Sequence, residues 1–418
     1  MTLTTSTHFA SVIAEGADWR EAAKRALEKL QAARTENDGM NFGFLYLTDA
    51  LAEDVGSIMT LFKSVTGIER WVGCTGIGVV GCGSESIDVP AISAMIGKFD
   101  ESQIKLFYTE HERIRDLDKD VLPWMKTCQP MLVLTHGQPE AGNLPVFTLE
   151  RIAETFGGYT AGGMTSSRVR HLHFAQDIYE HGFSGAAFSS EITVASALSQ
   201  GGRPVGPIYE VSKVSGNVIF DFRNFETNEI LSAEDAFQNA IKDLVKDKTG
   251  KDADTVFLKE MEGEFDIPEE YKNLFRGDMH IGFPVPGSDQ KDYLVRNILG
   301  IDSDEGAMAV TETPAEGTLV RFIHRDDETV RADLSHTLVT LHERVQKEQG
   351  SFSPKGALYI SCIARAATHF RENSEETGGE MALIREIIGD VPLTGLYAGG
   401  EISGGRLYGY TGILILFL

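Results

Sequence analysis

A glycine-rich segment recurs three times along this chain and limits the folds that the chain can adopt. The fullest copy, Gly395–Gly405, contains one acidic residue, Glu401, and the two shorter copies are Gly73–Gly78 and Gly158–Gly163. Glycine at this density indicates backbone with positive φ, or a surface that another group approaches closely. The three segments therefore predict turns, each at a point where chain segments crowd together.

Each glycine segment has similar surroundings. A strand-like run that ends in a polar residue comes first, and a helix-compatible stretch separates it from the glycines. The three runs are Leu45–Asp49, Leu132–His136 and Leu358–Cys362, and the third interval is longer because the polar stretch Arg371–Glu380 is inserted. The pattern predicts three diverged strand–helix–strand units within a mixed α/β (α+β) fold. Chance similarity in a chain with 43 glycines is the alternative interpretation.

The remainder of the chain differs from these units. Glu101–Lys126 is charged and irregular, and we interpret it as an interval between the first two units. After Gly206 alternating apolar and polar residues predict hairpins, with helices over 233–245 and 329–349 and a charged loop over 246–254. We therefore expect a domain division at Gly206, with one region over 18–206 and another over 207–418, the latter made of a hairpin-rich part (207–350) and the third unit (351–418).

Composition restricts the partners and the location of the protein. The formal net charge of −24 argues against nucleic acid or an anionic membrane surface as a partner, because both attract basic patches. No apolar stretch approaches the length of a membrane span, and Met1–Ser11 lacks the pattern of a signal peptide. The four cysteines, Cys74, Cys82, Cys128 and Cys362, show no disulfide-framework spacing. We expect a cytoplasmic protein with free thiols and no membrane insertion.

Motifs for nucleotide binding and catalysis are weak. Gly76–Gly81 fits the dinucleotide fingerprint literally, but that motif requires a helix to begin at once, and Cys82-Gly83-Ser84 follows instead. The chain has no G-x-S-x-G elbow, no H-E-x-x-H motif and no Walker loop. The sequence therefore gives little support for a nucleotide fold or for an enzyme.

Several short strings occur together in one order: Gly73–Gly81 with Glu85, Ser199–Gly206, Arg296–Gly300, Ser361–Cys362 with Arg365, and Gly395–Ile402. With these strings the chain resembles the FIST sensory proteins, with both the N-terminal and the C-terminal FIST regions. The resemblance runs from about Asp18 to the end of the chain. Each string alone is a weak signal, but several independent strings in the same order make the resemblance specific.

The resemblance implies an intracellular sensor of a small ligand, with amino acids among the suggested ligands. Some relatives bind haem and respond to nitric oxide, and an F-box ubiquitin-ligase subunit carries the same two regions. The chain departs from the family pattern at four positions. Gly202 stands where relatives often have cysteine, Ala364 and Ala366 replace the usual glycines, and Tyr408 stands where histidine is expected. The ligand can therefore differ from that of typical members.

The polar residues that end the predicted strands suggest a site. In open α/β sheets, ligands bind beyond the carboxyl ends of the strands, where the repeat places Asp49, His136 and Cys362. One turn further on, Arg365 can hold a carboxylate through two hydrogen bonds, and Glu401 can accept an ammonium group. The amides of Gly399 and Gly400 would be further donors. The alternative is that Arg365 and Glu401 pair with one another and only brace the turn.

Four further residues are expected near the rim of this pocket: Thr75 or Glu85, and the loop that carries Gln200 and Arg203. Arg203 is a second candidate for binding an anion, and a surface ion pair is its alternative role in so acidic a protein. Cys362 is either an inert buried thiol or a reactive one whose pKa is lowered by Arg365.

Three functions remain open at this point. The first is a cytosolic sensor that binds a small ligand without a cofactor and signals through a separate protein, such as a histidine kinase or a cyclase. The second is a haem-based nitric-oxide sensor, with His136, His280 or His336 as possible axial ligands. The third is an enzyme that uses Cys362 as its nucleophile. We expect no metal site, and the sequence identifies neither the ligand nor the oligomeric state.

Overall fold

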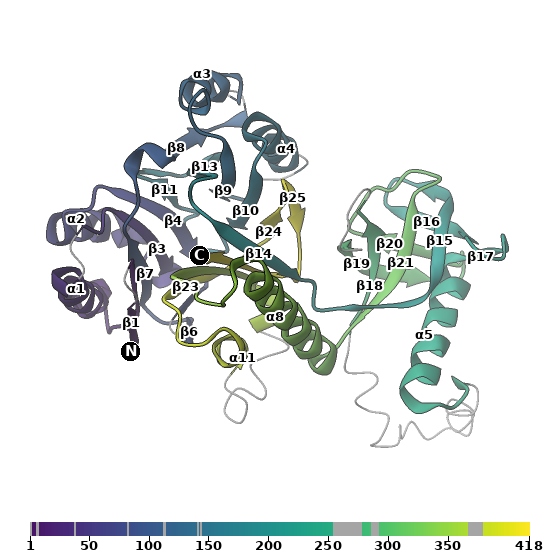
Figure 1. Ribbon diagram of the computed structural model, residues 1–418. Helices are drawn as coiled ribbons and strands as arrows, with labels where there is room; N and C mark the ends of the chain where they lie inside the picture. The colour runs from purple at the N-terminus through teal and green to yellow at the C-terminus, as the bar shows by residue number, and fades with distance from the viewer. Residues whose placement is uncertain are drawn as a thin grey trace. The chain divides into compact units, whose positions relative to one another are not determined.

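The computed structural model divides into two compact units (Figure 1). The first unit comprises residues 1–199 and 334–418, and the second comprises residues 200–333. In the part of the chain that the structure describes, no helix is both long and apolar enough to cross a membrane. The described residues are 2–5, 8–36, 39–81, 83–111, 114–139, 142, 144–253, 278–285, 292–366 and 379–418.

The first unit contains three copies of one order of elements. The first copy consists of β2 (Phe9–Glu15), α1 (Trp19–Glu36), β3 (Phe42–Thr48), α2 (Val55–Thr66), β4 (Arg70–Gly76), the hairpin β5 (Gly78–Gly81) and β6 (Ser84–Ile87), and β7 (Ala91–Gly97). The second consists of β8 (Ile104–Thr109), α3 (Ile114–Met125), β9 (Pro130–Gly137), α4 (Leu144–Phe156), β10 (Tyr159–Met164), the hairpin β11 (His173–Ala175) and β12 (Asp177–Tyr179), and β13 (Phe183–Ser189). The third consists of β14 (Val194–Ser199), α8 (Asp327–Gln349), β22 (Gly356–Cys362), α9 (Ile363–Arg365), α11 (Gly379–Ile388), β23 (Leu393–Ala398), the hairpin β24 (Glu401–Ser403) and β25 (Arg406–Tyr408), and β26 (Gly412–Phe417).

The three copies exchange their hairpins. Each copy forms a sheet from its own four long strands, in the orders β2-β7-β3-β4, β8-β13-β9-β10 and β14-β26-β22-β23. The next two strands of each sheet are a hairpin from another copy: β11-β12 extends the first sheet, β24-β25 the second, and β5-β6 the third. β1 (Thr2–Thr5) adds one edge strand to the first sheet. The predicted threefold repeat is therefore present, and each copy is larger than the strand–helix–strand unit that the sequence indicated.

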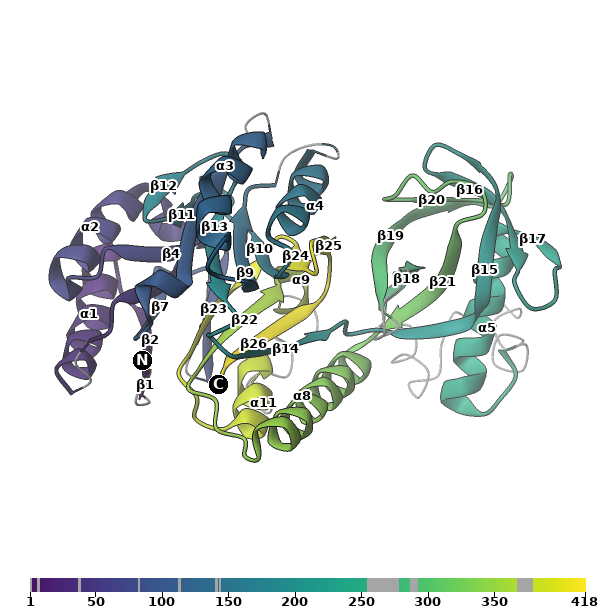
Figure 2. The same ribbon diagram turned by 45° about the horizontal axis from the view of Figure 1, so that its top comes forward.

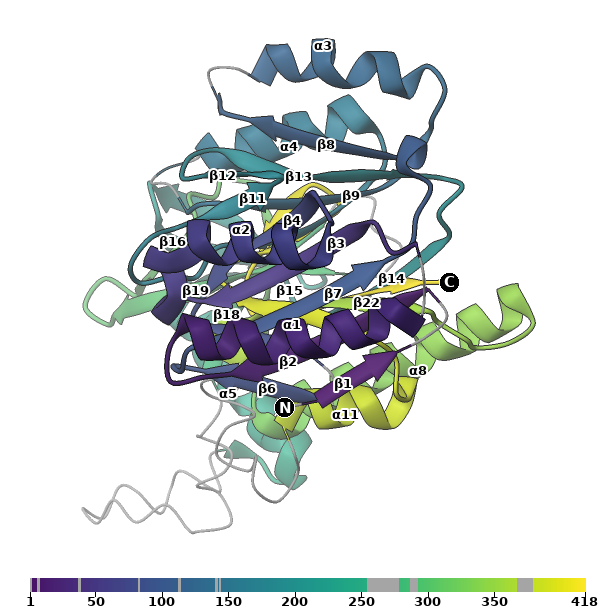
Figure 3. The same ribbon diagram turned by 90° about the vertical axis from the view of Figure 1, so that its left-hand side faces the viewer.

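The three sheets share one apolar core, and helices cover their outer faces. A single cluster of buried side chains joins residues of all three sheets, among them Phe44, Leu134 and Ile360. Figure 3 shows α1 and α2 in front of the first sheet, where Leu27 and Phe62 belong to a second apolar cluster. The helices α3 and α4 cover the second sheet in the same way. The apolar period of each helix explains this arrangement, because one face alone is buried.

One glycine in each copy is required by the close approach of two parallel strands. Gly73, Gly162 and Gly395 are at equivalent positions, each opposite a residue of the preceding parallel strand. A Cβ atom at these positions would lie only 1.8, 1.9 and 1.7 Å from a carbonyl oxygen of that strand. These contacts explain why the glycine segments recur.

The predicted equivalence of Asp49, His136 and Cys362 is wrong in register. All three lie at or next to the end of a first parallel strand. When Gly73, Gly162 and Gly395 are aligned, the residue that follows each glycine pairs with Tyr46, His136 and Ile360, respectively. His136 is therefore equivalent to Tyr46 and Ile360, and not to Asp49 and Cys362. The three strand-like runs end at different distances from the residue that the glycine of each copy approaches. The apolar pattern of a run does not reveal this distance.

The second unit is a closed antiparallel barrel on which the helix α5 packs (Figure 2). The barrel order is β15-β21-β18-β19-β20-β16, and pairing of β15 with β16 closes it. The predicted hairpins are present, whereas closure into a barrel was not predicted. The elements are β15 (Arg203–Ser215), β16 (Val218–Asn224), β17 (Ile230–Ser232), α5 (Ala233–Thr249), β18 (Asp278–Pro284), β19 (Tyr293–Asp302), β20 (Ala307–Val310) and β21 (Leu319–Arg325).

Three expectations about the chain's organisation differ from the structure. Glu101–Lys126 is not an interval, because it contains β8 and α3 of the second copy. The charged loop expected over 246–254 begins as the last turn of α5, which ends at Thr249, and residue 254 lies outside the described part of the chain. The compact units do not divide at Gly206, since the barrel is inserted between β14 and α8 of the third copy. The first boundary between the units lies between Ser199 and Gln200, and the division into regions 18–206 and 207–418 stays a prediction.

The close approach at Gly395 gives a test of the repeat. Gly395→Ala should cost about 3 kcal/mol or more of unfolding free energy, because its Cβ overlaps the Tyr359 carbonyl oxygen. Gly56→Ala is the matched control, since Gly56 lies in α2 with open space around it and should gain up to about 1 kcal/mol. Urea unfolding measures both values. Equal effects of the two substitutions would contradict this account of the glycine segments.

Candidate functional site

A network of buried polar side chains lies at the carboxyl end of β22. The Arg365 guanidinium is completely buried and forms an ion pair with the equally buried Glu380, with Nη2–Oε1 and Nε–Oε1 distances of 2.8 and 3.0 Å. Tyr359 and Ser361 donate hydroxyl hydrogen bonds of 2.5 and 2.8 Å to the two oxygens of Glu380. Arg365 also donates from Nη1 to the carbonyl and hydroxyl oxygens of Ser199, at 3.2 and 3.1 Å.

Local sequence explains how this network is built. Tyr359 and Ser361 are two residues apart in β22, so they point to the same face of the sheet. Glu380 lies in the first turn of α11, where the partial positive charge of the helix N-terminus favours a carboxylate. Gly412 leaves room for the network, because a Cβ atom there would lie 2.3 Å from the Tyr359 hydroxyl oxygen. The partner of Arg365 is thus Glu380, so the alternative in which Arg365 and Glu401 pair with one another is wrong.

Glu401 occupies a separate buried environment beside Cys362. Its Oε2 accepts hydrogen bonds from the backbone N–H and the hydroxyl of Thr411, at 2.9 and 3.0 Å. Its Oε1 is buried and accepts no N–H or O–H hydrogen bond from any residue that the structure describes, and the Cys362 thiol is a hydrogen-bonding neighbour of the carboxyl group. The Thr411 carbonyl oxygen accepts a hydrogen bond of 2.9 Å from the Cys362 amide. The third glycine segment therefore places a carboxyl group with one unsatisfied oxygen next to a thiol.

Burial changes the acidity of both groups. Desolvation raises the pKa of Glu401 to about 7, against the opposing effects of the Thr411 hydrogen bonds, the Cys362 thiol and the Arg365 charge. Desolvation and the neighbouring Glu401 charge raise the pKa of Cys362 to about 12. Cys362 is thus a protonated, buried thiol near neutral pH, which argues against its use as a nucleophile.

The glycines expected to donate to a ligand hold another strand instead. The Gly399 amide donates to the Met164 carbonyl oxygen at 3.0 Å, and the Gly400 carbonyl oxygen accepts from the Met164 amide at 2.8 Å. Thr75 belongs to the first sheet, where its hydroxyl donates to the carbonyl oxygens of Arg170 and Leu172 at 3.1 and 3.2 Å. These residues shape the turns, and none contacts Arg365 or Glu401 through a hydrogen bond reported for the described residues.

The other expected rim residues are divided between the two units. Glu85, in the first unit, accepts a hydrogen bond from the buried Tyr397 hydroxyl, and the charges of Glu85 and Glu380 add to burial in raising the pKa of Tyr397. Gln200 and Arg203 belong to the second unit. There Gln200 Oε1 accepts from the Tyr293 amide at 3.1 Å, and Arg203 forms an ion pair with Asp247 at 2.5 Å.

The three histidines considered as haem ligands lie in different environments, and haem binding stays a prediction. His136 is completely buried, and its Nε2 and Nδ1 lie 3.2 Å from the Tyr46 hydroxyl oxygen and the Gly163 carbonyl oxygen. Burial lowers the pKa of His136 to about 4. His336 is exposed on α8, and His280 is buried in the barrel strand β18.

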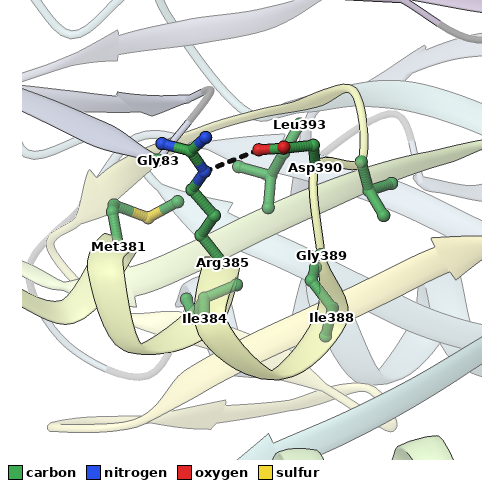
Figure 4. Close-up of a pocket in the computed structure, with 9 residues that line it drawn as sticks. Gly83, Met381, Ile384, Arg385, Ile388, Gly389, Asp390 and Leu393 are labelled. Atoms are coloured by element: carbon green, nitrogen blue, oxygen red, sulfur yellow. Dashed lines mark hydrogen bonds and ion pairs between the residues drawn. The ribbon is translucent and has the colours of Figure 1, made fainter.

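Neither cavity is the predicted pocket. A small pocket beside α11 has a volume of about 10 Å³, and Figure 4 shows the side chain of Arg385 reaching Asp390 across it, at 2.6 Å. That volume holds about one water molecule. A larger cleft of about 390 Å³ is lined by residues at the ends of β2, β7 and β26, including Phe9, Lys98 and Phe417. Cys362, Arg365 and Glu401 line neither of them, although all three are close to the third glycine segment.

Sequence reasoning missed Glu380, Tyr359, Ser361 and Thr411. Glu380 was included in a polar insertion, although it immediately precedes the apolar helical pattern of α11. The polar residues Tyr359 and Ser361 alternate within an otherwise apolar strand, and this pattern could have indicated a buried polar partner.

The network predicts a large stability cost when its charge balance is broken. Arg365→Met should lower the unfolding free energy by about 3–5 kcal/mol, because the buried Glu380 carboxylate loses its counterion. Arg385→Met in the same region removes an exposed pair with Asp390 and should cost less than about 1 kcal/mol. Chemical denaturation distinguishes them. A cost for Arg365→Met as small as that of Arg385→Met would show that the network contributes little.

Glu401 predicts a pH dependence of stability. Because its pKa is raised from an ordinary value near 4.5 to about 7, the folded protein holds this proton more tightly than the unfolded chain. The contribution of Glu401 to the free energy of unfolding is therefore full below about pH 4.5. This contribution, at most about 3 kcal/mol, is lost as the pH rises through about 7. Glu401→Gln should remove this slope, whereas the exposed-site control Glu154→Gln should keep it. Denaturation curves between pH 4 and 8 test this, and an unchanged slope in Glu401→Gln would contradict it.

Comparison with known proteins identifies two family domains in the chain. Residues 41–224 match the FIST N domain, and residues 257–404 match the FIST C domain. An uncharacterised protein of Mycobacterium tuberculosis (strain ATCC 25618 / H37Rv) is 27% identical over 273 residues, which are 63% of this chain and 60% of that protein. An uncharacterised protein of Mycobacterium bovis (strain ATCC BAA-935 / AF2122/97) is 29% identical over 145 residues, or 34% of each chain. The two family matches cover most of the sequence, and the chain belongs to the FIST family, whose domains are small-ligand sensory domains.

Proposed function

We propose that this protein is a sensor whose first unit binds a small ligand that carries an ammonium group, such as an amino acid or a related metabolite. The observation that supports this proposal is the buried Oε1 of Glu401, which accepts no N–H or O–H hydrogen bond within the described part of the chain and has only the weak thiol donor of Cys362 beside the carboxyl group. A buried acceptor without a donor costs about 1–3 kcal/mol. An ammonium group would donate to this oxygen and neutralise the carboxylate charge.

Backbone strain beside Glu401 supports the same assignment. Tyr410 has a φ of 64°, in the left-handed region that bulky residues rarely adopt. It immediately precedes Thr411, whose amide and hydroxyl hold the other oxygen of Glu401. Strain of this kind costs about 1–3 kcal/mol and is concentrated at ligand clamps and switches. Because Glu401 is completely buried, ligand binding requires a local movement, and the strained segment is the natural place for it.

The carboxylate end of such a ligand has a less direct partner. Arg365 is the nearest cation identified for Glu401, since its charge affects the pKa of Glu401, but its guanidinium is held by Glu380 and Ser199. Binding of a ligand carboxylate would have to replace part of these contacts. The ammonium contact with Glu401 is therefore the part of the proposal that the geometry supports best, and Cys362 would form the adjacent wall.

We further propose that the protein is cytoplasmic and that its signal passes to a separate protein, such as a histidine kinase or a cyclase. The two FIST regions account for most of the chain, and three of its cysteines, Cys74, Cys128 and Cys362, are buried free thiols. Kinase or cyclase activity in the purified chain alone would contradict signalling through a separate protein. Cell fractionation tests the cytoplasmic location.

Ligand binding should be tested by calorimetry with a panel of amino acids and the matching carboxylic acids that lack the ammonium group. At pH 6.5 Glu401 is largely protonated, so binding of an ammonium ligand should release up to about one proton, seen as a heat that depends on the buffer. Glu401→Gln should weaken binding by roughly 10- to 100-fold, the value of a charge-assisted hydrogen bond.

Glu154→Gln, an exposed position on α4, is the control and should leave affinity and proton release unchanged. Equal binding of an amino acid and its deaminated analogue would exclude the ammonium contact. So would an amino acid that binds Glu401→Gln as tightly as the parent protein.

A further inference from the structure

We propose a second ligand site in the barrel unit, where Arg203 and His324 bind an oxyanion, a carboxylate or a phosphate group. The site lies at the end of the barrel where β15 begins and β21 ends, and it is independent of the proposed function of the first unit. Arg203 and His324 are directly opposite in the antiparallel pairing of these strands, which places their Cβ atoms about 4.5–5.5 Å apart.

Arg203 presents the edge of its guanidinium that suits an oxyanion. Its Nη1 atom donates to Asp247, which confirms the surface ion pair considered from the sequence. Its Nε and Nη2 atoms are buried and donate to no residue in the described part of the chain. These two N–H groups are parallel and match the spacing of two oxygens on a carboxylate or a phosphate. Arg203 can therefore keep Asp247 and bind an anion at the same time.

His324 adds a buried donor on the same side. Its side chain is 1% exposed, its Nδ1 lies 3.8 Å from Oδ2 of Asp326, and neither ring nitrogen has a hydrogen-bond partner among the residues that the structure describes. Neutral imidazole carries one N–H donor and one acceptor, so burial without partners is costly for both. An oxyanion next to Arg203 would accept from the imidazole N–H and remove part of that cost.

The surrounding charges allow one additional negative charge. Lys248, in the last turn of α5, is hydrogen-bonded to Asp326, and Arg203 is paired with Asp247, so the two cations and two carboxylates balance. Burial lowers the pKa of His324 to about 4, with opposing effects from Asp326 on one side and from Lys248 and Arg203 on the other. An anion bound at this point would favour protonation of His324, because the imidazolium would then balance its charge.

This coupling provides a measurement on the unmodified protein. Histidine-selective NMR should follow the His324 ring through a pH titration, with and without inorganic phosphate or acetate, at constant ionic strength set by chloride. Binding should raise the apparent pKa of His324 from about 4 by about 1 to 3 pH units. The anion that saturates at the lower concentration identifies whether a phosphate or a carboxylate is the preferred group. An unchanged pKa with both anions would overturn the proposal.

Two substitutions locate the anion on the residues named here. Arg203→Lys keeps the charge but removes the paired N–H groups, and it should weaken binding by about tenfold or more. His324→Gln should weaken binding and remove its rise at low pH. Arg223→Lys is the matched control on the same barrel, because Arg223 forms a partly exposed pair with Glu210.

Circular dichroism and the melting temperature should establish that each variant is folded before binding is compared. Saturable binding that is equal in Arg203→Lys and Arg223→Lys would place the anion elsewhere and refute the site. If Arg203→Lys does not fold, the NMR titration of the parent protein still decides the question.

Discussion

Each sheet of the first unit is completed by a hairpin that another copy supplies. The backbone groups at the edges of β4, β10 and β23 pair with β11, β24 and β5, so no copy forms its full sheet from its own chain segment. Unpaired backbone donors and acceptors at a buried edge are costly. The three copies consequently depend on each other, and the short turns at which the chain passes from one sheet to the next are the points where this dependence is strongest. The recurrent glycines act within the strands that precede those turns, where Gly73, Gly162 and Gly395 permit the close approach of the neighbouring parallel strand.

The sequence predicted the repeat because a close backbone approach leaves no alternative to glycine. The strand–helix–strand part of each copy was accessible for the same reason, since apolar runs of strand length preceded every glycine segment. The first strand and helix of the second copy were missed because β8 is only partly buried and α3 is charged, with Pro123 inside it. Hairpin exchange and closure of the barrel could not be predicted, because local periodicity does not specify which distant strand edge a strand joins. The predicted register of His136 is wrong for a related reason, because the residue at which a strand-like run ends does not determine which residues pair across the sheet.

The sequence predicted which residues of the third copy lie close together, but it did not predict their hydrogen-bond partners. Cys362, Arg365 and Glu401 do lie near one strand end and one glycine turn, as the pattern of the third repeat suggested. The partner of Arg365 depended on where α11 begins, and a charged stretch before an apolar helix does not reveal that its last acid turns inward. The Arg365 and Glu380 side chains are both completely buried, so the stability of the network depends on how well each charge is paired. Arg365 and Glu380 satisfy each other with help from Tyr359 and Ser361, so their cost of desolvation is offset by several short contacts.

Glu401 differs from Glu380 because only one of its two oxygens has donors among the described residues, and its pKa rises accordingly. The position of Glu401 between two sheets gives its unsatisfied oxygen a structural consequence. Glu401 lies in β24, which pairs with β10 in the second sheet, while Thr411, its hydrogen-bond donor, immediately precedes β26 of the third sheet. The Glu401–Thr411 contact thus joins two sheets at the point where the third copy passes its hairpin to the second. A change in the charge or the partners of Glu401 acts on that junction, and a small ligand bound there would be coupled to the arrangement of strands that holds the three copies together.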